Sequence, residues 1–393
     1  MKIAVVHNDY GKFSGEEAVV RDHIALLQDH GCEVVEFRRS SAELHGFGGA
    51  VKGFLSGIYN PFSRRKFAHF LEAEKPEIIH IHNLYPLLNP CILPEAKKRK
   101  IPVVMTVHNF RLFCPNGLFA VNNRICEDCA QQKSILPCLR KNCLHSRFKT
   151  LGYALRTWIA QRRHYYLDNV DCFLCLTEFQ REKLVAYGIP AERCVIVPNF
   201  IDAQWLERAG QTTSEPGGYV AYMGRLSEEK GIDLLLAAAK QLPEIPFKLA
   251  GNGADAYREA APANVEFVGY LTGDAQFEFM RHAKIQIMAS RCYENFPTTL
   301  LQGMALGVPA LVPNHGGMPE IIQGAGEAYS FETMISAIRA LFQNSARLEE
   351  YRHGALRQIQ NFSPAYCEKL LTQVYLAFTT KKQLQATNST VIK

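Results

Sequence analysis

Two kinds of segment alternate along the chain, and this alternation limits what it can fold into. Short apolar runs of about five residues are typical of strands buried on both faces of a parallel sheet. Stretches with a helical spacing of apolar residues separate these runs. One of them, residues 16–31, ends at Gly31 as a helix closed by glycine does. The first series of runs is IAVVH (3–7), EVVEF (33–37), EIIHIH (77–82), PVVMTVH (102–108), CFLCL (172–176) and CVIVP (194–198).

A second series of the same kind follows a break in the pattern. The break, residues 198–218, is rich in Pro, Gly, Ser and Thr and is typical of an interdomain linker. Two alternating series predict an α/β protein with two doubly wound, Rossmann-like domains, whose ligands bind beyond the carboxyl ends of the strands in a cleft between the facing domains. The second series of runs is YVAYMG (219–224), FKLAG (247–251), VEFVG (265–269), IQIMAS (285–290) and PALVP (309–313).

The length of the chain agrees with two domains. With 393 residues, 47% of them hydrophobic, each half is long enough to bury a core of its own. We expect an N-terminal domain over residues 1–198 and a C-terminal domain over residues 199–363. A last helix over residues 364–380 is expected to cross back to the N-terminal domain. The tail, residues 381–393, has no apolar period.

The apolar segments and the distribution of charge indicate a cellular compartment and a kind of partner. No segment approaches the roughly 18 apolar residues of a membrane-spanning helix, and the first apolar run is too short for a signal peptide. We therefore expect a cytoplasmic protein whose 12 cysteines are mostly reduced. Residues 97–166 contain 14 Lys and Arg but only two acids, which suggests an anionic partner.

The segment GRLSEEKG, residues 224–231, follows a predicted strand and precedes a predicted helix. Gly224 permits a tight turn. Arg225 and Lys230 place two cations near a helix N-terminus, whose free N–H groups also attract anions. This arrangement suits a diphosphate; the alternative is a solvated helix start with incidental charges.

A second segment, residues 290–322, combines a strand end, a loop and a helix start. Glu294 lies in the loop after Ser290, at a strand's carboxyl end. The following helix offers backbone N–H groups at Thr298 and Thr299, which favours ligand binding there. On its own, Glu294 would be interpreted as a charge at a helix N-terminus.

In combination these segments resemble the retaining glycosyltransferases of family 4 (GT4), which have the GT-B fold. The resemblance implies that residues 1–198 form the acceptor-side domain and residues 199–363 the donor-binding domain. In the first domain, Ser14-Gly15-Glu16-Glu17 resembles the family's small-residue loop, and His108 ends the fourth strand, where the family keeps a histidine. In the second domain the matching residues are Arg225 and Lys230 of the phosphate clamp, Leu249, Gly251 and Gly253 of an L-x-G-x-G turn, Glu294-Asn295-Phe296-Pro297, and Gly316-Gly317-Met318-Pro319-Glu320.

The resemblance implies a hexosyltransferase-like enzyme that transfers a sugar, with retention, from a UDP- or GDP-sugar to a saccharide or lipid-linked saccharide acceptor in cell-surface polysaccharide biosynthesis. Two fixed cations would replace a metal ion, so we expect no catalytic metal or other cofactor. The catalytic residues it implies are His108, Glu294, Arg225 and Lys230. The donor-binding residues it implies are Gly15, Gly224, Arg225, Lys230, Gly251, Gly253, Glu294, Asn295, Phe296, Pro297, Thr298 and Gln302.

One position departs from the family pattern. Gln302 stands where the family has a second glutamate, which is thought to bind the donor ribose; the amide keeps a carbonyl acceptor but has no charge. This change supports an alternative, a nucleotide-sugar-binding scaffold of a glycan assembly complex without transfer activity. An epimerase or a phosphorylase of the same fold is a further alternative, which the Glu294–Glu320 block and the chain length disfavour.

A cysteine-rich insertion, residues 109–146, interrupts the first domain. Cys126 and Cys129 are followed by Cys138 and Cys143, a spacing near that of a structural zinc site. The alternative is a packing loop with buried free thiols.

Residues 147–166 mix basic and aromatic residues in a helical pattern. Such a helix suits the anionic inner face of the cell membrane, where the protein would be peripheral. The alternative is an ordinary surface helix whose apolar stripe packs on the sheet. No recognition motif supports a nucleic-acid partner.

Overall fold

The computed structural model describes residues 1–10, 15–211 and 217–391, with side chains at all of them except Phe47 and residues 380–391. Two units make up the chain, and each has its own sheet. The N-terminal unit comprises Met1–Val121, Cys126–Val197 and Glu368–Lys393, and the C-terminal unit comprises Asn122–Ile125 and Pro198–Cys367.

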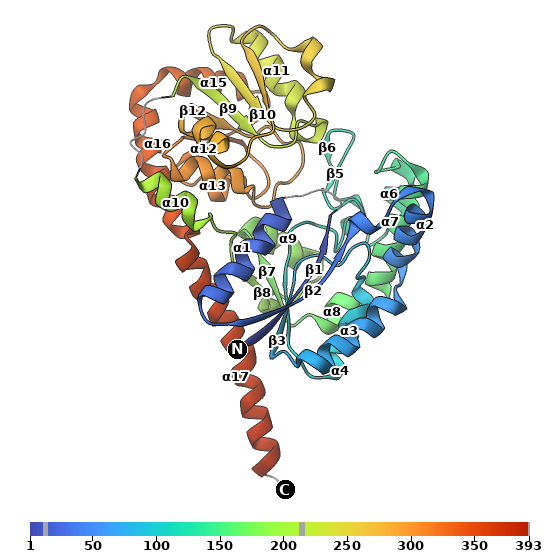
Figure 1. The fold of residues 1–393 in the computed structure, drawn as a ribbon. Helices are drawn as coiled ribbons and strands as arrows, with labels where there is room; N and C mark the ends of the chain where they lie inside the picture. The colour runs from blue at the N-terminus through green and yellow to red at the C-terminus, as the bar shows by residue number, and fades with distance from the viewer. Residues whose placement is uncertain (11–14, 212–216, 392–393) are drawn as a thin grey trace. The chain divides into compact units, whose positions relative to one another are not determined.

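The N-terminal unit is built on a six-stranded sheet in the order β2-β1-β3-β4-β7-β8, whose neighbouring strands are all parallel. Its strands are β1 (Lys2–Asp9), β2 (Glu33–Ser40), β3 (Ile78–Ile81), β4 (Val103–Thr106), β7 (Cys172–Cys175) and β8 (Cys194–Ile196) (Figure 1). Strands β3, β4 and β7 are buried at every residue, which is why their sequences are apolar without alternation. The helices are α1 (Gly15–Asp29), α2 (Gly46–Ile58), α3 (Pro61–Glu74), α4 (Leu93–Lys98), α7 (Arg147–Arg162), α8 (Tyr165–Asn169) and α9 (Glu178–Ala186). The insertion adds the short elements β5 (Ala120–Val121), β6 (Arg124–Ile125), α5 (Asp128–Gln131) and α6 (Leu136–Lys141).

The C-terminal unit has a second parallel sheet, in the order β11-β10-β9-β12-β13-β14. In chain order this is 3-2-1-4-5-6, the order of a Rossmann sheet, so the prediction of two doubly wound α/β domains is confirmed. Its strands are β9 (Tyr219–Met223), β10 (Phe247–Ala250), β11 (Val265–Gly269), β12 (Ala283–Ile287), β13 (Ala310–Pro313) and β14 (Gly326–Tyr329). Its helices are α10 (Ala203–Gly210), α11 (Ile232–Gln241), α12 (Gly273–Arg281), α13 (Thr298–Ala305), α14 (Met318–Ile321), α15 (Met334–Gln343) and α16 (Ser345–Gln358).

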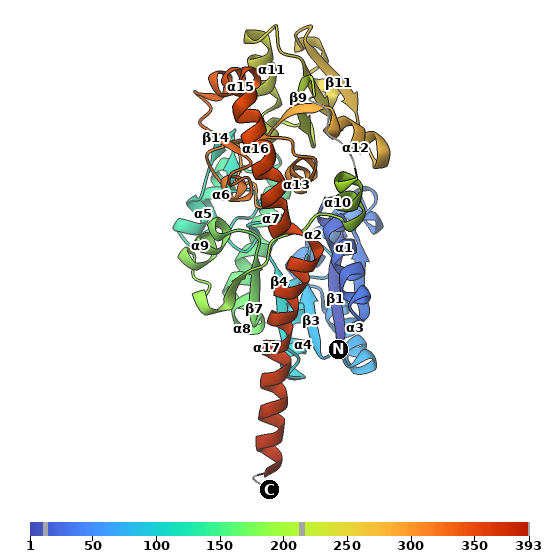
Figure 2. The same ribbon diagram turned by 90° about the vertical axis from the view of Figure 1, so that its left-hand side faces the viewer.

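The last helix, α17 (Pro364–Val391), belongs to the N-terminal unit from Glu368 onward. Figure 2 shows it alongside the sheet of that unit. Tyr375 is fully buried there, and its hydroxyl is 2.6 Å from Nδ1 of His80 on β3. The helix continues through most of the segment that the sequence analysis treats as a tail.

Helix α7 exposes large apolar side chains that would ordinarily be buried in a protein core. Phe148, Leu151 and Trp158 are 51%, 42% and 48% exposed. The reason is the close approach of α2, because a Cβ at Gly152 would lie 2.6 Å from the Phe54 ring and only small side chains fit this contact. The buried positions of α7 are Thr150, Gly152, Ala154, Arg156, Thr157 and Ala160. Phe148, Leu151 and Trp158 therefore do not pack on the sheet, whereas Ala160 of the same helix belongs to the core of the N-terminal unit.

Among the described residues, no helix is both long enough and apolar enough to span a membrane.

Candidate functional site

The candidate donor site lies at the carboxyl ends of β9 and β12, where the strand order of the C-terminal sheet reverses. Gly224 directly follows β9, and Glu294 lies in the loop between β12 and α13. Ligands of doubly wound sheets bind at this switch point. The topology therefore brings the clamp segment and the Glu294 loop to one edge of the sheet.

Glycines hold the loops after β9 and β10 together. The backbone N–H of Gly224 donates to the Ala250 carbonyl at 3.0 Å. Gly251 has φ +148°, and a Cβ there would lie 1.8 Å from the Gly224 oxygen; at Gly253, with φ +107°, a Cβ would lie 2.3 Å from the Leu226 oxygen. Only glycine fits these positions, which explains the L-x-G-x-G turn.

Lys230 and Glu294 form a buried ion pair. The Lys230 Nζ donates to Glu294 Oε1, which also accepts from the Ser290 hydroxyl at 2.6 Å. The two charged side chains are 18% and 14% exposed. Burial alone would raise the pKa of Glu294, but Lys230 and Ser290 outweigh burial and hold this pKa below its ordinary value. Glu294 is therefore a carboxylate paired with an ammonium group.

Arg225 differs from Lys230 in exposure. Its side chain is 68% exposed, and its Nη2 lies 3.2 Å from Glu229 Oε1. A surface pair of this kind is weak, so the guanidinium is available to a ligand.

The G-G-x-P-E motif positions the Glu294 loop. The Gly317 N–H donates to the Glu294 carbonyl at 2.9 Å, and a Cβ at Gly316 would lie 3.1 Å from that oxygen. His315 Nε2 lies 2.9 Å from the Ser290 carbonyl. Sequence reasoning assigned no role to Ser290 or His315, because no spacing rule links them to a glutamate in another loop.

The remaining predicted donor residues differ in their burial and in their contacts. Asn295 and Phe296 are buried, and the Phe296 ring packs against Phe362 at 5.3 Å. Pro297 precedes the first residue of α13, Thr298, as expected. Gln302 Oε1 accepts from Gln276 Nε2 at 2.9 Å, so the carbonyl acceptor at this position already has one partner within the protein.

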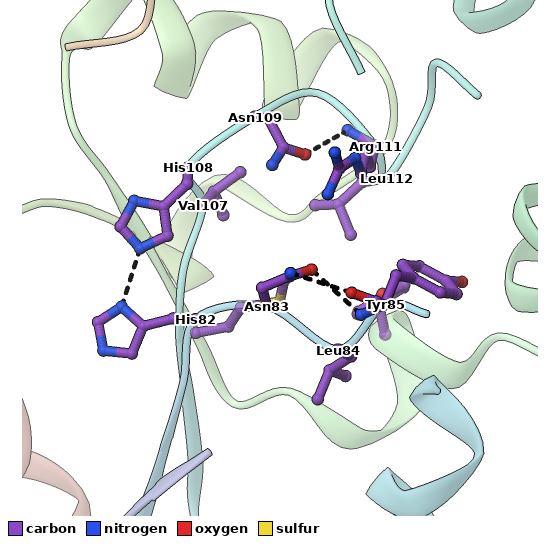
Figure 3. Close-up of a pocket in the computed structure, with 11 residues that line it drawn as sticks. His82, Asn83, Leu84, Tyr85, Val107, His108, Asn109, Arg111 and Leu112 are labelled. Atoms are coloured by element: carbon purple, nitrogen blue, oxygen red, sulfur yellow. Dashed lines mark hydrogen bonds between the residues drawn. The ribbon is translucent and has the colours of Figure 1, made fainter. Parts of the chain in front are cut away.

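The other two predicted residues, Gly15 and His108, belong to the N-terminal unit. Gly15 opens α1, and a Cβ there would meet no atom of the described residues within 4 Å. Ser14 of the same loop lies outside the described residues. His108 Nε2 lies 2.8 Å from His82 Nδ1, and both residues line a small pocket (Figure 3).

His108 belongs to a group of five histidines that sequence reasoning did not foresee, His7, His23, His80, His82 and His108. We call this group the histidine stack, because the His82 ring stacks on the rings of both His80 and His108. They come from β1, α1, β3 and the segments that follow β3 and β4. Ring centroids are 4.3 Å apart for His80 and His82, and 5.1 Å for His82 and His108. Burial lowers the pKa of all five imidazoles, to about 3 for His23 and His108 and to about 4 for His7.

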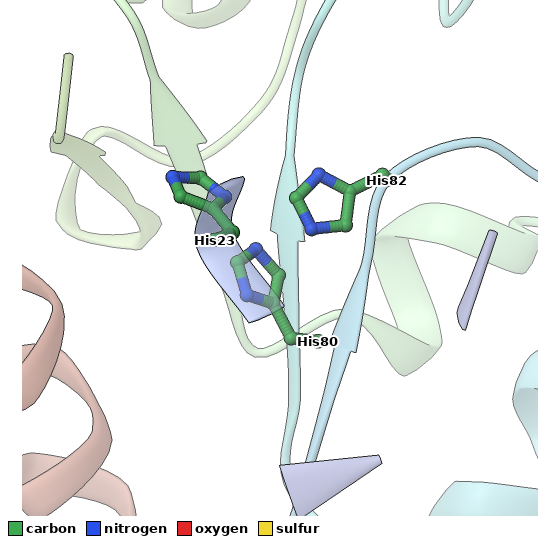
Figure 4. A group of neighbouring side chains, drawn as sticks. All are labelled: His23, His80 and His82. Carbon is green, nitrogen blue, oxygen red and sulfur yellow. The ribbon is translucent and has the colours of Figure 1, made fainter. Parts of the chain in front are cut away.

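Three of these rings, His23, His80 and His82, bring nitrogen atoms within 4.8 Å of one another (Figure 4). Their geometry does not suit a metal. A metal ion lies in the plane of each imidazole that binds it, whereas the rings of His80 and His82 are stacked face to face with an interplanar angle of 29°. Both nitrogens of His80 are already bonded, to Tyr375 and Thr106. The group is a stack of neutral rings.

The cysteines of the insertion show one close pair. A hydrogen bond from Cys138 is the main cause that lowers the pKa of the Cys143 thiol. Cys126 Sγ accepts from Lys141 Nζ at 3.2 Å. Within the described part of the chain, no three cysteine sulfurs lie within 4.8 Å of one another, so these thiols do not form a preassembled metal site.

Two family models match successive parts of the chain. The model described as Glycosyltransferase Family 4 matches residues 13–205, and the model described as Glycosyl transferases group 1 matches residues 203–357. Together they span both units.

Curated relatives share part of their length with the chain. Alpha-galactosylglucosyldiacylglycerol synthase of Streptococcus pneumoniae is 28% identical over 223 residues, which are 51% of this chain and 58% of the relative. O-antigen chain mannosyltransferase B of Escherichia coli is 24% identical over 238 residues, 54% of this chain and 62% of the relative. The chain thus spans less than two thirds of either relative.

Solved structures match over nearly the full chain. HepE of Anabaena, in complex with UDP and glucose, has a TM-score of 0.61 at 16% identity, covering 95% of this chain and 99% of that one. Sucrose-phosphate synthase of Thermosynechococcus elongatus has a TM-score of 0.69 at 15% identity, covering 98% and 99%. At this identity the likeness shows a shared fold, the GT-B fold.

Proposed function

This chain belongs to glycosyltransferase family 4, and on that premise we propose that it is a retaining enzyme that transfers a sugar from a UDP- or GDP-sugar to a saccharide or lipid-linked saccharide. Relatives named for glycolipid and O-antigen synthesis support a role in cell-surface polysaccharide or glycolipid assembly.

The observation that carries the proposal is the cluster of Lys230, Glu294 and Ser290 at the switch point of the C-terminal sheet. Negative charge grows on the diphosphate as the bond to the sugar breaks. Lys230 and the exposed Arg225 stabilise that charge, and the dipole of a neighbouring helix N-terminus adds to their effect. Two cations suffice for a diphosphate, so the transfer proceeds without a divalent metal.

In the ligand-free chain both cations are held by carboxylates, Lys230 by Glu294 and Arg225 by Glu229. A bound diphosphate replaces these carboxylates as the partner of the two cations. Glu294 is then released to accept hydrogen bonds from sugar hydroxyls. His108, kept neutral by burial, is assigned to the transferred sugar as a hydrogen-bond partner.

Calorimetric binding of UDP, GDP and ADP, with and without Mg²⁺, tests the clamp. We expect one diphosphate to bind equally well in both conditions. Lys230→Met is expected to lose about 10²–10³-fold in turnover, whereas Lys240→Met, on the exposed end of α11, keeps full activity. Absence of binding by all three nucleotides would reject the donor site, and binding without any transfer would favour the scaffold alternative that Gln302 suggests.

We also propose that α7 and its neighbours contact an anionic membrane surface. Phe148, Leu151 and Trp158 are exposed on α7, and Leu55 and Phe62 are exposed on α2 and α3. Beside Trp158 is a surface hollow with no acidic residue in its lining, formed by Tyr59, Arg64, Trp158, Ile159, Arg162, Arg163 and Tyr165. Exposed apolar groups among cations are the pattern of a helix that lies on anionic lipid.

Co-sedimentation with vesicles distinguishes a membrane-binding surface from one that only faces solvent. We expect recovery with phosphatidylglycerol vesicles but not with phosphatidylcholine vesicles. Trp158→Ser should reduce that recovery severalfold, whereas Tyr270→Ser, a still more exposed aromatic position in the C-terminal unit, should not. Equal recovery with both kinds of vesicle would remove the membrane proposal.

A further inference from the structure

Polar atoms without a hydrogen-bond partner gather at one place in the N-terminal unit. In the part of the chain that the structure describes, these buried atoms include both ring nitrogens of His7, Nε2 of His82, Oε1 of Glu16, Nε of Arg111, and Nε and Nη2 of Arg156. Buried polar groups are almost always hydrogen-bonded, so such a concentration calls for a ligand or solvent as partner. It surrounds the carboxyl ends of β1, β3 and β4, the ligand-binding edge of this sheet.

Arg156 is the most unusual member of the group. It is only 5% exposed, and its guanidinium carbon lies 4.4 Å from the centre of the Tyr85 ring and 3.6 Å from that of Tyr153. Burial and, after it, the like charge of Arg111 lower its pKa. No ion pair of Arg156 exists among the described residues. A buried cation without a counterion is unfavourable unless an anion completes it.

Arg111 connects this cation to the pocket beside His108. Its Nη1 donates to the Tyr10 hydroxyl at 2.9 Å, and that hydroxyl donates to Glu16 Oε2 at 2.9 Å. Arg111 also lines the pocket that contains His108 and Tyr85 (Figure 3). Arg111 therefore lies in the wall of the pocket, whereas Arg156 does not line it and packs on the ring of Tyr85, which does.

We propose that Arg111 binds a negatively charged group of the acceptor and that the buried charge of Arg156, behind Tyr85, adds to the attraction, so that the acceptor class is an anionic saccharide. The inference rests on the proposed transferase function and names its acceptor. Guanidinium groups bind phosphate and carboxylate oxygens through paired N–H donors. The enclosed space is about 20 Å³, enough for one water-sized oxygen, so the saccharide lies at the pocket mouth and inserts one anionic oxygen.

Both a phosphate and a uronic-acid carboxylate have this chemistry, and three probes separate them. Glucose 1-phosphate, glucuronic acid and glucose are titrated into the full chain by calorimetry. Lys230→Met serves as the background, because it removes the C-terminal clamp as a competing anion site. We expect at least one of the two anions to bind at least tenfold more tightly than glucose, and the better anion identifies the group. Equal affinity for all three overturns the proposal.

Substitution of Arg156 distinguishes binding from a structural brace between two tyrosines. Arg156→Met keeps the apolar stem and removes the charge. If the cation serves a ligand, this variant keeps or raises its Tm while anion affinity falls at least tenfold. If Arg156 only braces the rings, Tm falls and affinity is unchanged, which overturns the proposal. Arg65→Met, at an exposed position of α3, should change neither quantity.

Arg111→Gln provides an independent test should Arg156→Met fail to fold. It should weaken anion binding tenfold without weakening UDP binding, and unchanged anion affinity would refute the assignment. The donor site and the acceptor assignment can be rejected independently of each other. Loss of UDP binding by the wild-type chain rejects the donor site while anion binding stands, and the reverse result rejects only the acceptor assignment.

Discussion

Acidification should unfold the N-terminal unit, because its histidine stack is buried in the neutral form. The ordinary pKa of histidine is about 6.5, whereas burial lowers the pKa of His23 and His108 to about 3 and that of His7 to about 4. The folded chain thus binds fewer protons than the unfolded chain between these values. Stability is complete above the ordinary pKa and is lost as the pH falls below it.

The magnitude follows from linkage. Between about pH 7.5 and about pH 5, each such histidine removes about 2 kcal/mol, and the three together remove about 6 kcal/mol. Glu16 and Asp9 near His7 oppose its shift, and their effect is already contained in its value. Because the stability of a domain is about 5–15 kcal/mol, the loss is a large fraction of the total.

Thermal unfolding by near-UV circular dichroism at both pH values measures this effect. We expect Tm to fall by more than ten degrees, since 1 kcal/mol corresponds to about 2–4 °C in a domain of this size. His23→Gln removes one of the five titrating rings and should reduce the pH dependence by about a fifth, whatever its effect at neutral pH. The exposed His69→Gln is the matched control. A wild-type Tm that is the same at both pH values would refute the reasoning.

Three further outcomes are expected. Gly251→Ala forces a Cβ into the Gly224 carbonyl and should abolish UDP binding, whereas Gly210→Ala, where a Cβ meets nothing, should bind normally; isothermal titration decides. Tyr375→Phe loses the hydrogen bond to His80 and should lower the free energy of unfolding by about 1 kcal/mol in urea titrations. We also propose that zinc binding draws together the thiols of Cys126, Cys129, Cys138 and Cys143, which are not preassembled, so protein purified without chelator should contain about one equivalent by mass spectrometry, and less than about a tenth would count against it.

Sequence patterns located the two sheets and the clamp segment because those features are local. Apolar runs and glycines act over a few residues, and the order of motifs along the chain places Arg225 and Glu294 at strand ends. The pairing of Lys230 with Glu294 joins residues 64 positions apart, which no local spacing reveals. The histidine stack likewise draws on four segments, and only His80 and His82 are near neighbours in sequence.

Helix α7 shows a different limit of sequence patterns. Its aromatic residues have a helical spacing, which favours burial of that face against the sheet. Contact with α2 requires small residues instead, so the apolar face is turned outward. Composition alone cannot decide which face of such a helix is buried, because the decision depends on the shape of its neighbour.

The course of α17 affects how these enzymes can be dissected or recombined. The helix starts in the unit that carries the candidate donor site, but Leu371 and Tyr375 complete the core of the other unit. A fragment that ends at Val197 would lack α17. The apolar surface that this helix covers would then be exposed, and the fragment should be poorly soluble. Chimeras that exchange the C-terminal unit between homologues should therefore place their second junction near Cys367. The C-terminal helix then packs against the N-terminal unit of its own protein.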